Sequence, residues 1–267
     1  MSIWLKFWLT LSVIIALAMM VLVFVLLQSE RGRFPAKASQ APWTVLITGQ
    51  DNDDHEFICS GALISKQWVL TAAHCLEDQP VLVTTAIALE NHVAQSSASE
   101  KVVVHPSAQG YYWDTKHTVS KDGDMPVDLG LVKLQRPIEN SVIALAADSH
   151  QDSESQIWGY GPDADDYDYH LQRVPADGEA CQRRKQEMIC VASGIDQSPR
   201  PCQGDSGGPM TIQEHSRPVL LAVLSIVELP KGNHCTPDGL IGKLGWQTWL
   251  TPIHPYLSWI KSVLKKN

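Results

Sequence analysis

An unbroken run of 21 uncharged residues, from Phe7 to Leu27, divides this chain into two regions that must fold in different surroundings. As a helix, which rises about 1.5 Å per residue, the run would span roughly 30 Å, close to the hydrocarbon thickness of a bilayer. A cleaved signal peptide has a shorter apolar core, of roughly 7–15 residues, with a small-residue cleavage site directly after it. The run also lacks the polar face that a soluble helix would need. We therefore predict an uncleaved signal anchor, a single transmembrane helix within residues 1–33, with cleavage and secretion as the alternative.

The charge of the remaining chain limits its partners, and its cysteine usage favours a location outside the cytoplasm. Three basic residues and one acidic residue in positions 1–33 sum to +2, so the total of -8 leaves -10 for residues 34–267. This acidic balance argues against a protein that binds nucleic acid by electrostatic attraction. All six cysteines follow the uncharged run, and an even number suits an oxidising compartment. We expect residues 34–267 to form one periplasmic or extracellular domain, of an oligomeric state that the sequence does not indicate.

Short β-rich runs separated by Asp, Gly, Pro and Ser clusters make up this region. Many short strands at modest spacing are typical of an all-β barrel or sandwich, and the lack of strand–helix alternation argues against a doubly wound sheet. Apolar residues at helical spacing near the C-terminus predict one helix. The predicted strands are Trp43–Thr48, Gly61–Ile64, Trp68–Thr71, Val81–Thr85, Lys101–His105, Leu129–Leu134, Gln156–Trp158 and Val219–Ile226, and the helical residues are Tyr256, Leu257, Ile260 and Leu264.

The segment from Gly204 to Pro209 is the sharpest candidate for chemistry. Its glycines flank Ser206, and glycine lets a backbone adopt positive φ and point successive N–H groups at a developing oxyanion. The alternative is a plain glycine-rich turn with an inert serine. The segment also matches the nucleophile elbow of α/β-hydrolases, but no parallel-sheet pattern precedes it and only 61 residues follow Ser206.

Two further residues stand out by their position in the predicted strands. His74 ends a strand among small residues and precedes Cys75, although a single histidine is most often a surface or core residue. Asp128 opens an apolar strand, where a charge is costly unless something pairs with it, and its alternative role is a strand-start cap. Residues 51–54, three Asp and one Asn, lack the spacing and the terminal Glu of an EF-hand loop and indicate a solvated turn. The sequence shows no metal-binding cluster or phosphate-binding loop, so we expect no metal and no cofactor.

These segments place His, Asp and Ser in that order along the chain, and the body resembles the trypsin/chymotrypsin-like serine proteases. The resemblance implies an all-β fold, a double antiparallel β-barrel (chymotrypsin-like) with a C-terminal helix, here preceded by one N-terminal transmembrane helix. It also implies a serine endopeptidase that acts on protein or peptide substrates. The motifs that carry it are Ala41–Val45, Thr71–Cys75, Val104–Pro106, Asp128–Leu134, Gly159–Gly161, Cys202–Pro209, Ser225 and Ser258–Ile260.

The same resemblance assigns a role to each candidate residue. Ser206 would be the nucleophile, His74 the general base and Asp128 the residue that orients His74. The backbone N–H groups of Gly204 and Ser206 would form the oxyanion hole. The implied disulfides are Cys59–Cys75, Cys181–Cys190 and Cys202–Cys235, pairings that spacing alone does not fix.

The chain departs from this family where activation normally occurs. Most members begin, after activation, with Ile-Val-Gly-Gly, whose α-amino group pairs with the Asp before the nucleophile, here Asp205. No such tetrapeptide is present, and the nearest candidate is Phe34–Lys37 after Arg33. Burying Asp205 without a cation would be costly, so we expect an internal Lys, Arg or His, or cleavage elsewhere. The rival to an active enzyme is therefore a catalytically silent or zymogen-locked protease-like binding protein.

The expected substrate pocket also departs from trypsin. Arg200 stands at the pocket base, where trypsin-like members carry Asp, and would repel Lys or Arg side chains. Val227 would narrow the pocket, Gly239 fits its opposite wall, and Ser225 would lie beside Asp128. We therefore predict a specificity unlike trypsin, with an acidic residue before the scissile bond, unless Arg200 is paired internally or turned outward.

Overall fold

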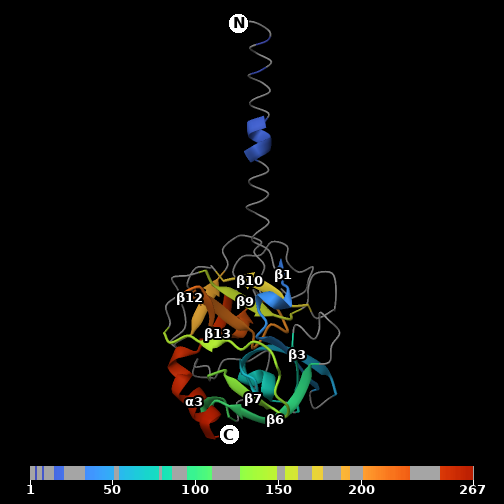
Figure 1. Cartoon of the computed structure of the whole chain (residues 1–267), viewed down its shortest axis with the longest axis vertical. Helices are drawn as coiled ribbons and strands as arrows, with labels where there is room; N and C mark the ends of the chain where they lie inside the picture. Colours follow the sequence, from blue (N-terminus) through green and yellow to red (C-terminus); the bar gives the residue numbers. More distant parts are fainter. Residues whose placement is uncertain are drawn as a thin grey trace.

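Two β-sheets form the body of the chain in the computed structural model (Figure 1). The first sheet is a closed barrel in the order β2-β3-β4-β7-β6-β5, in which β5 pairs back onto β2. Its strands are β2 (Thr44–Gln50), β3 (Glu56–Ser65), β4 (Trp68–Thr71), β5 (Leu82–Thr85), β6 (Ser96–Val104) and β7 (Gly130–Leu134). The structure describes residues 4, 8, 15–20, 34–50, 54–77, 80–85, 95–109, 127–148, 154–161, 170–176, 188–192, 201–228 and 247–266.

Buried side chains on neighbouring strands fill the interior of the first barrel. Val45, Ile47 and Val83 are fully buried and project from neighbouring strands, as the alternation of side chains along a strand requires. Every residue of β4 is buried, so this strand is covered on both faces. Closure pairs the outer strands with each other, which leaves the barrel without an exposed sheet edge.

The second sheet carries the remaining strands in the order β1-β10-β9-β12-β13-β14-β11. Within the described residues its two ends, β1 and β11, are not paired with each other. Among the described strands of this sheet, β8 runs parallel to β13 and the other pairings are antiparallel. The strands are β1 (Phe34–Pro35), β8 (Ala144–Leu145), β9 (Gln156–Gly159), β10 (Gln172–Pro175), β11 (Ile189–Ala192), β12 (Pro209–Glu214), β13 (Arg217–Glu228) and β14 (Gln247–Pro252).

The helices are short and join or flank the two sheets. The predicted C-terminal helix is confirmed as α3 (Leu257–Lys266), which buries Ile260 and Val263 against the core and lies at the side of the body (Figure 1). A 3-10 turn, η4 (His254–Tyr256), leads into it from β14. The other 3-10 helices are η1 (Ala38–Gln40), η2 (Ala73–Leu76) and η3 (Pro106–Ala108).

The expected all-β double-barrel architecture with a C-terminal helix is thus present, and most predicted strands appear with similar bounds. The run Trp68–Thr71 coincides with β4, whereas the run that began at Gly61 is the second half of the longer strand β3. The sequence pattern does not indicate strand β12, because its first residue, Pro209, closes the glycine-rich segment and is typical of a turn.

The N-terminal segment is only partly described. Residues 15–20 are helical, as are Trp4 and Trp8, whose ring centroids are 6.2 Å apart. Most of the run from Phe7 to Leu27 lies outside the described residues. Among those that are described, no helix is both long enough and apolar enough to cross a membrane. The signal anchor therefore stays a prediction.

Candidate active site

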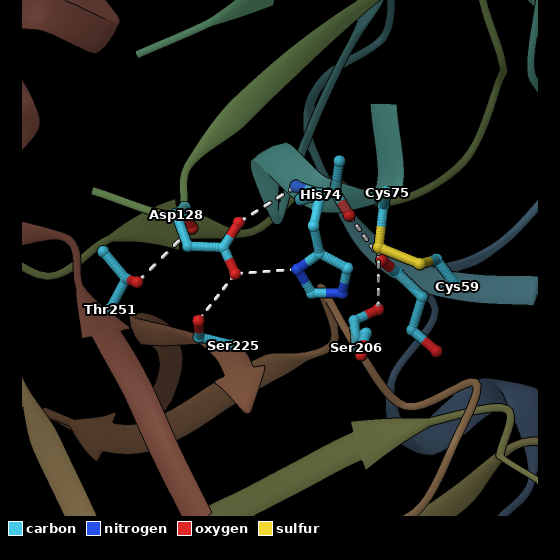
Figure 2. A network of polar contacts seen from close by, with 9 residues as sticks. Cys59, His74, Cys75, Asp128, Ser206, Ser225 and Thr251 are labelled. Carbon is cyan, nitrogen blue, oxygen red and sulfur yellow. Dashed lines mark hydrogen bonds and ion pairs between the residues drawn. A yellow bond between two sulfur atoms is a disulfide. The ribbon is translucent and has the colours of Figure 1, made fainter. Parts of the chain in front are cut away.

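His74 lies on η2, the 3-10 turn that follows β4 at the rim of the first barrel. Its backbone N–H donates to Oδ1 of Asp128 at 3.0 Å, and its ring Nδ1 lies 2.8 Å from Oδ2 of the same carboxylate. A carboxylate only accepts hydrogen bonds, so Nδ1 carries the proton and the neutral ring leaves Nε2 as its basic atom. In Figure 2 the imidazole lies between Asp128 and Ser206.

Asp128 precedes β7 and is only 1% exposed, so its charge depends on the groups around it. Besides His74, the Ser225 hydroxyl donates to Oδ2 at 2.6 Å (Figure 2). The Thr251 hydroxyl donates to the backbone carbonyl of Asp128 at 3.3 Å. The carboxylate thus holds His74 rather than serving as a strand-start cap. These bonds supply the partners that a buried charge requires.

Two opposing influences set the basicity of His74. Burial is the largest influence and lowers the pKa of the imidazole, because it disfavours the charged form. The negative charge of Asp128, its hydrogen bond and the charge of Glu77 act in the other direction. Together they outweigh burial, so the pKa of His74 lies above its ordinary value of 6.5. This makes His74 a suitable acceptor and donor of a proton near neutral pH.

Ser206 lies in the second of two successive β-turns, and the glycine spacing explains both turns. The Asp205 N–H donates to the Cys202 carbonyl at 3.0 Å, and the Gly208 N–H donates to the Asp205 carbonyl at 2.8 Å. The third residue of each turn is a glycine with positive φ, +93° at Gly204 and +79° at Gly207. A type II turn requires positive φ at this position. The glycines thus have a structural role that the sequence indicated.

The Asp205 carboxylate stabilises these turns by accepting hydrogen bonds from the main chain. The Asp205 side chain is buried, and its carboxylate accepts the Gly161 N–H and the Cys202 N–H, each at 2.7 Å. Phe34, the nearest sequence candidate for an activation terminus, instead pairs with Arg173 in the strand pair β1–β10. Backbone amides therefore supply part of the stabilisation that we expected from a cation, and a cationic partner for Asp205 stays a prediction.

One predicted disulfide, between Cys59 and Cys75, is present, and the other two pairings stay predictions. Cys59 and Cys75 are bonded across 16 residues, and the Cys75 sulfur lies 3.6 Å from the Ser206 carbonyl oxygen. Cys190 and Cys202 are also disulfide-bonded. Their predicted partners Cys181 and Cys235 lie outside the described residues.

A metal site is not supported at this position. Ligand atoms of Cys59, His74 and Cys75 lie within 4.8 Å of one another. However, metals bind cysteine as a thiolate, and both sulfurs are consumed by their disulfide. The cluster is therefore a by-product of the disulfide that closes the His74 loop.

The substrate-pocket predictions are only partly described. Ser225 is buried on β13 with its hydroxyl on Asp128, and Val227 is half-buried two residues later. Arg200 and Gly239 lie outside the described residues. Sequence reasoning missed Thr251 and Ser60, which contact Asp128 and Ser206 respectively. No motif marks these two hydroxyl residues, because they are distant in the chain from the groups they bind.

Comparisons with known proteins show what the chain is similar to over most of its length. The family model described as Trypsin matches residues 30–260. The renal glandular kallikrein of Mastomys natalensis is 27% identical over 255 residues, which cover 88% of this chain and 90% of the relative. Human kallikrein-10 is 27% identical over 255 residues, which cover 87% of this chain and 82% of the relative. Glandular kallikrein-10 of Rattus norvegicus is 25% identical over 253 residues, covering 88% and 90%.

Proposed function

Because the chain belongs to the trypsin family of serine proteases, we propose that it is a serine endopeptidase that uses His74, Asp128 and Ser206. The observation that carries the proposal is the hydrogen-bonded row from Ser225 through the Asp128 carboxylate to His74, which lies next to Ser206 (Figure 2). A buried carboxylate in this position both fixes the ring tautomer and stabilises the imidazolium.

In the first half of the reaction, Ser206 Oγ forms a bond to the carbonyl carbon of the scissile peptide and its proton passes to Nε2 of His74. The carbon–nitrogen bond then breaks, and the proton on Nε2 passes to the leaving amine. An acyl-enzyme remains on Ser206. In the second half, water attacks this ester, gives its proton to Nε2, and the proton returns to Ser206 Oγ as the acid leaves.

The backbone N–H groups of Gly204 and Ser206 stabilise the oxyanion of the tetrahedral intermediate. The support for this role is their position in the two type II turns, whose glycines fix the direction of the peptide groups. Such donors act strongly because they are oriented before the reaction begins.

A fluorophosphonate probe tests the proposal directly. We expect it to label the full-length protein at Ser206 and to leave Ser206→Ala unlabelled. His74→Ala should also label poorly while remaining folded, because it lacks the base. A folded wild type that shows no Ser206-dependent labelling, before or after limited proteolysis, would support the rival hypothesis of a silent protease-like binding protein.

For specificity, we propose a pocket with Arg200 at its base, between Val227 and Gly239, that prefers an acidic residue before the scissile bond. The argument is electrostatic, since a cation at the base of the pocket repels Lys and Arg and attracts Asp and Glu. A peptide-library digest measures the preference. Cleavage mainly after Lys or Arg would exclude it, and Arg200→Asp should shift cleavage towards those residues.

We also propose that residues 1–33 anchor the domain of residues 34–267 to a membrane from outside the cytoplasm. Six of the eight exposed large apolar side chains in the described residues fall in positions 4–20, and Trp4 is 72% exposed. Such an apolar surface is unfavourable in water and typical of a lipid contact. Carbonate extraction of cell membranes tests the anchor. The protein should stay in the pellet, whereas a chain beginning at residue 34 should be released.

A further inference from the structure

Ser60 connects the first barrel to the turns that carry Ser206. It lies on β3 directly after Cys59 and is completely buried. Its backbone N–H donates to the Ser206 carbonyl at 2.7 Å, and its hydroxyl donates to the Gly204 carbonyl at 2.8 Å. We propose that Ser60 is a positioning residue that holds the two oxyanion donors in place. This inference deepens the proposed function and rests on it.

The direction of the Ser60 hydroxyl is fixed by its second partner. The Tyr160 N–H donates to Ser60 Oγ at 3.0 Å, so the hydroxyl accepts there and its single proton is left for the Gly204 carbonyl. The Ser60 carbonyl in turn accepts from the Thr71 hydroxyl at 2.7 Å. Thr71, on strand β4 of the same barrel, therefore fixes the position of Ser60. Ser60 in turn fixes Gly204 and Ser206, in the turns that precede β12 of the second sheet.

The two carbonyls that Ser60 holds lie on either side of the Asp205–Ser206 peptide group. One of them belongs to Gly204, which has φ of +93° and, as a glycine, more conformational freedom than Asp205 and Ser206 beside it. The peptide group that follows Gly204 is held on its N–H side by the bond from Asp205 to the Cys202 carbonyl, so without Ser60 its carbonyl side would have no such bond from the first barrel. The hydroxyl of Ser60 adds this second restraint, which keeps the neighbouring N–H groups directed at a common point.

A purely structural role would also account for a buried hydroxyl, so the two roles must be separated. Thr211 on β12 provides the matched control. Thr211 is also buried, at 4% exposed against 0% for Ser60, and its hydroxyl accepts the Trp158 indole N–H at 2.9 Å and can donate to the Gln156 carbonyl at 3.5 Å. Deleting it should cost similar stability, because one donor and one acceptor again lose their partner. However, Thr211 does not hold the segment from Gly204 to Ser206.

The test compares Ser60→Ala with Thr211→Val in the full-length protein. A peptide aldehyde forms a tetrahedral adduct with an oxyanion on Ser206, and the matching peptide alcohol binds without one. We expect Ser60→Ala to weaken the aldehyde and to lower kcat by about 10- to 100-fold, with alcohol binding and KM unchanged. Thr211→Val should lower Tm by a similar amount but keep the preference for the aldehyde. Equal aldehyde preference in all three proteins would overturn the proposal.

Further variants of Ser60 and an exchange measurement separate a loss of folding from a loss of positioning. Ser60→Thr retains a hydroxyl and should restore the aldehyde preference, and Ser60→Gly replaces Ser60→Ala if the alanine variant does not fold. Amide hydrogen exchange over residues 202–208 needs no activity, and it should rise in Ser60→Ala and not in Thr211→Val. An inactive wild type would refute the proposed function, whereas unchanged exchange in Ser60→Ala would refute the positioning role.

Discussion

The first barrel and the second sheet contribute to the candidate site in different ways. The first barrel closes on itself and presents His74 and Asp128 from its rim. The second sheet presents Ser206 on two turns whose shape depends on Gly204 and Gly207. In the first region, side-chain hydrogen bonds to one buried carboxylate set the geometry. In the second, backbone conformation does.

The two buried aspartates show the same difference. Asp128 accepts hydrogen bonds from the side chains of His74 and Ser225, so its charge acts on a group that can change protonation. Asp205 accepts backbone N–H groups of Gly161 and Cys202, so its charge holds the main chain. The Asp128 carboxylate thus affects the basicity of His74, and the Asp205 carboxylate affects the conformation of the main chain. Substitutions in the two regions should therefore reduce activity in distinguishable ways, through the basicity of His74 in the first barrel and through the main-chain conformation around Ser206 in the second sheet.

The largest effect is expected from Asp128→Asn, which removes the charge that acts on His74. The kcat value should fall by about 10⁴-fold, the loss known for the corresponding Asp→Asn substitution in a Ser-His-Asp triad. His74 must be neutral to accept a proton, so wild-type activity is lost as the pH falls through the raised pKa of His74. Without the carboxylate charge that pKa falls, and any residual activity should persist to lower pH.

The control for this prediction is Glu100→Gln, which removes a carboxylate from the surface of the same barrel. Glu100 pairs with Lys133 at 2.9 Å and is partly exposed, so its loss should leave the rate and pH profile unchanged. A pH–rate profile of both variants checks the result. If the acid limb of Asp128→Asn coincides with that of the wild type, Asp128 does not control the pKa of His74.

A smaller effect, confined to the rate, is expected from Gly204→Ala in the second sheet. The added Cβ would be strained at φ +93° and would lie 3.2 Å from the Gly161 Cα. The turn must shift, so kcat should fall by about 10²–10³-fold, as for loss of one oxyanion donor. Gln203→Ala, in the same turn, should stay within about twofold of the wild-type rate. Unchanged kcat in Gly204→Ala would mean that this N–H does not contact the oxyanion.

Removing the Cys59–Cys75 disulfide should affect stability more than chemistry. The bond closes a 16-residue separation in the first barrel, and a loop of that size contributes about 3 kcal/mol in the chain-entropy model. We expect the double substitution Cys59→Ala, Cys75→Ala to lower the free energy of unfolding by that amount in urea titration. Fluorophosphonate labelling of Ser206 should survive below the new midpoint. An unchanged midpoint would mean that the bond does not form in solution.

The smallest effect is expected at His105, where the first barrel meets the C-terminal helix. Its ring makes edge contacts with Tyr256 and Trp259, at centroid distances of 5.2 and 5.1 Å. Partial burial lowers the pKa of His105, so its contribution to stability is present above its ordinary value of 6.5 and is lost as the pH falls towards the folded value. His105→Gln should reduce the acid-induced fall in Tm by about 1 °C or less. An equal fall in both proteins would exclude this contribution.

The sequence predicted those parts of the molecule that local patterns encode. Strand β4 is a continuous apolar run, and the glycines around Ser206 indicated positive φ, because both signals lie within a few residues. Ser60 and Thr251 could not be assigned in this way. Each acts on a group more than a hundred residues away, and a hydroxyl in a strand gives no periodic signal. The parallel pair β8–β13 was missed for the same reason, since a two-residue strand has no period.

The hydrogen bonds on Asp128 also determine when the site can be completed during synthesis. The Ser225 hydroxyl comes from 97 residues further along the chain, and the Thr251 hydroxyl from 123 residues further. Neither partner exists while the first barrel is emerging from the ribosome, although His74 and Asp128 are already made. The arrangement around Asp128 is therefore assembled only at the end of translation, when β14 has returned to the first barrel.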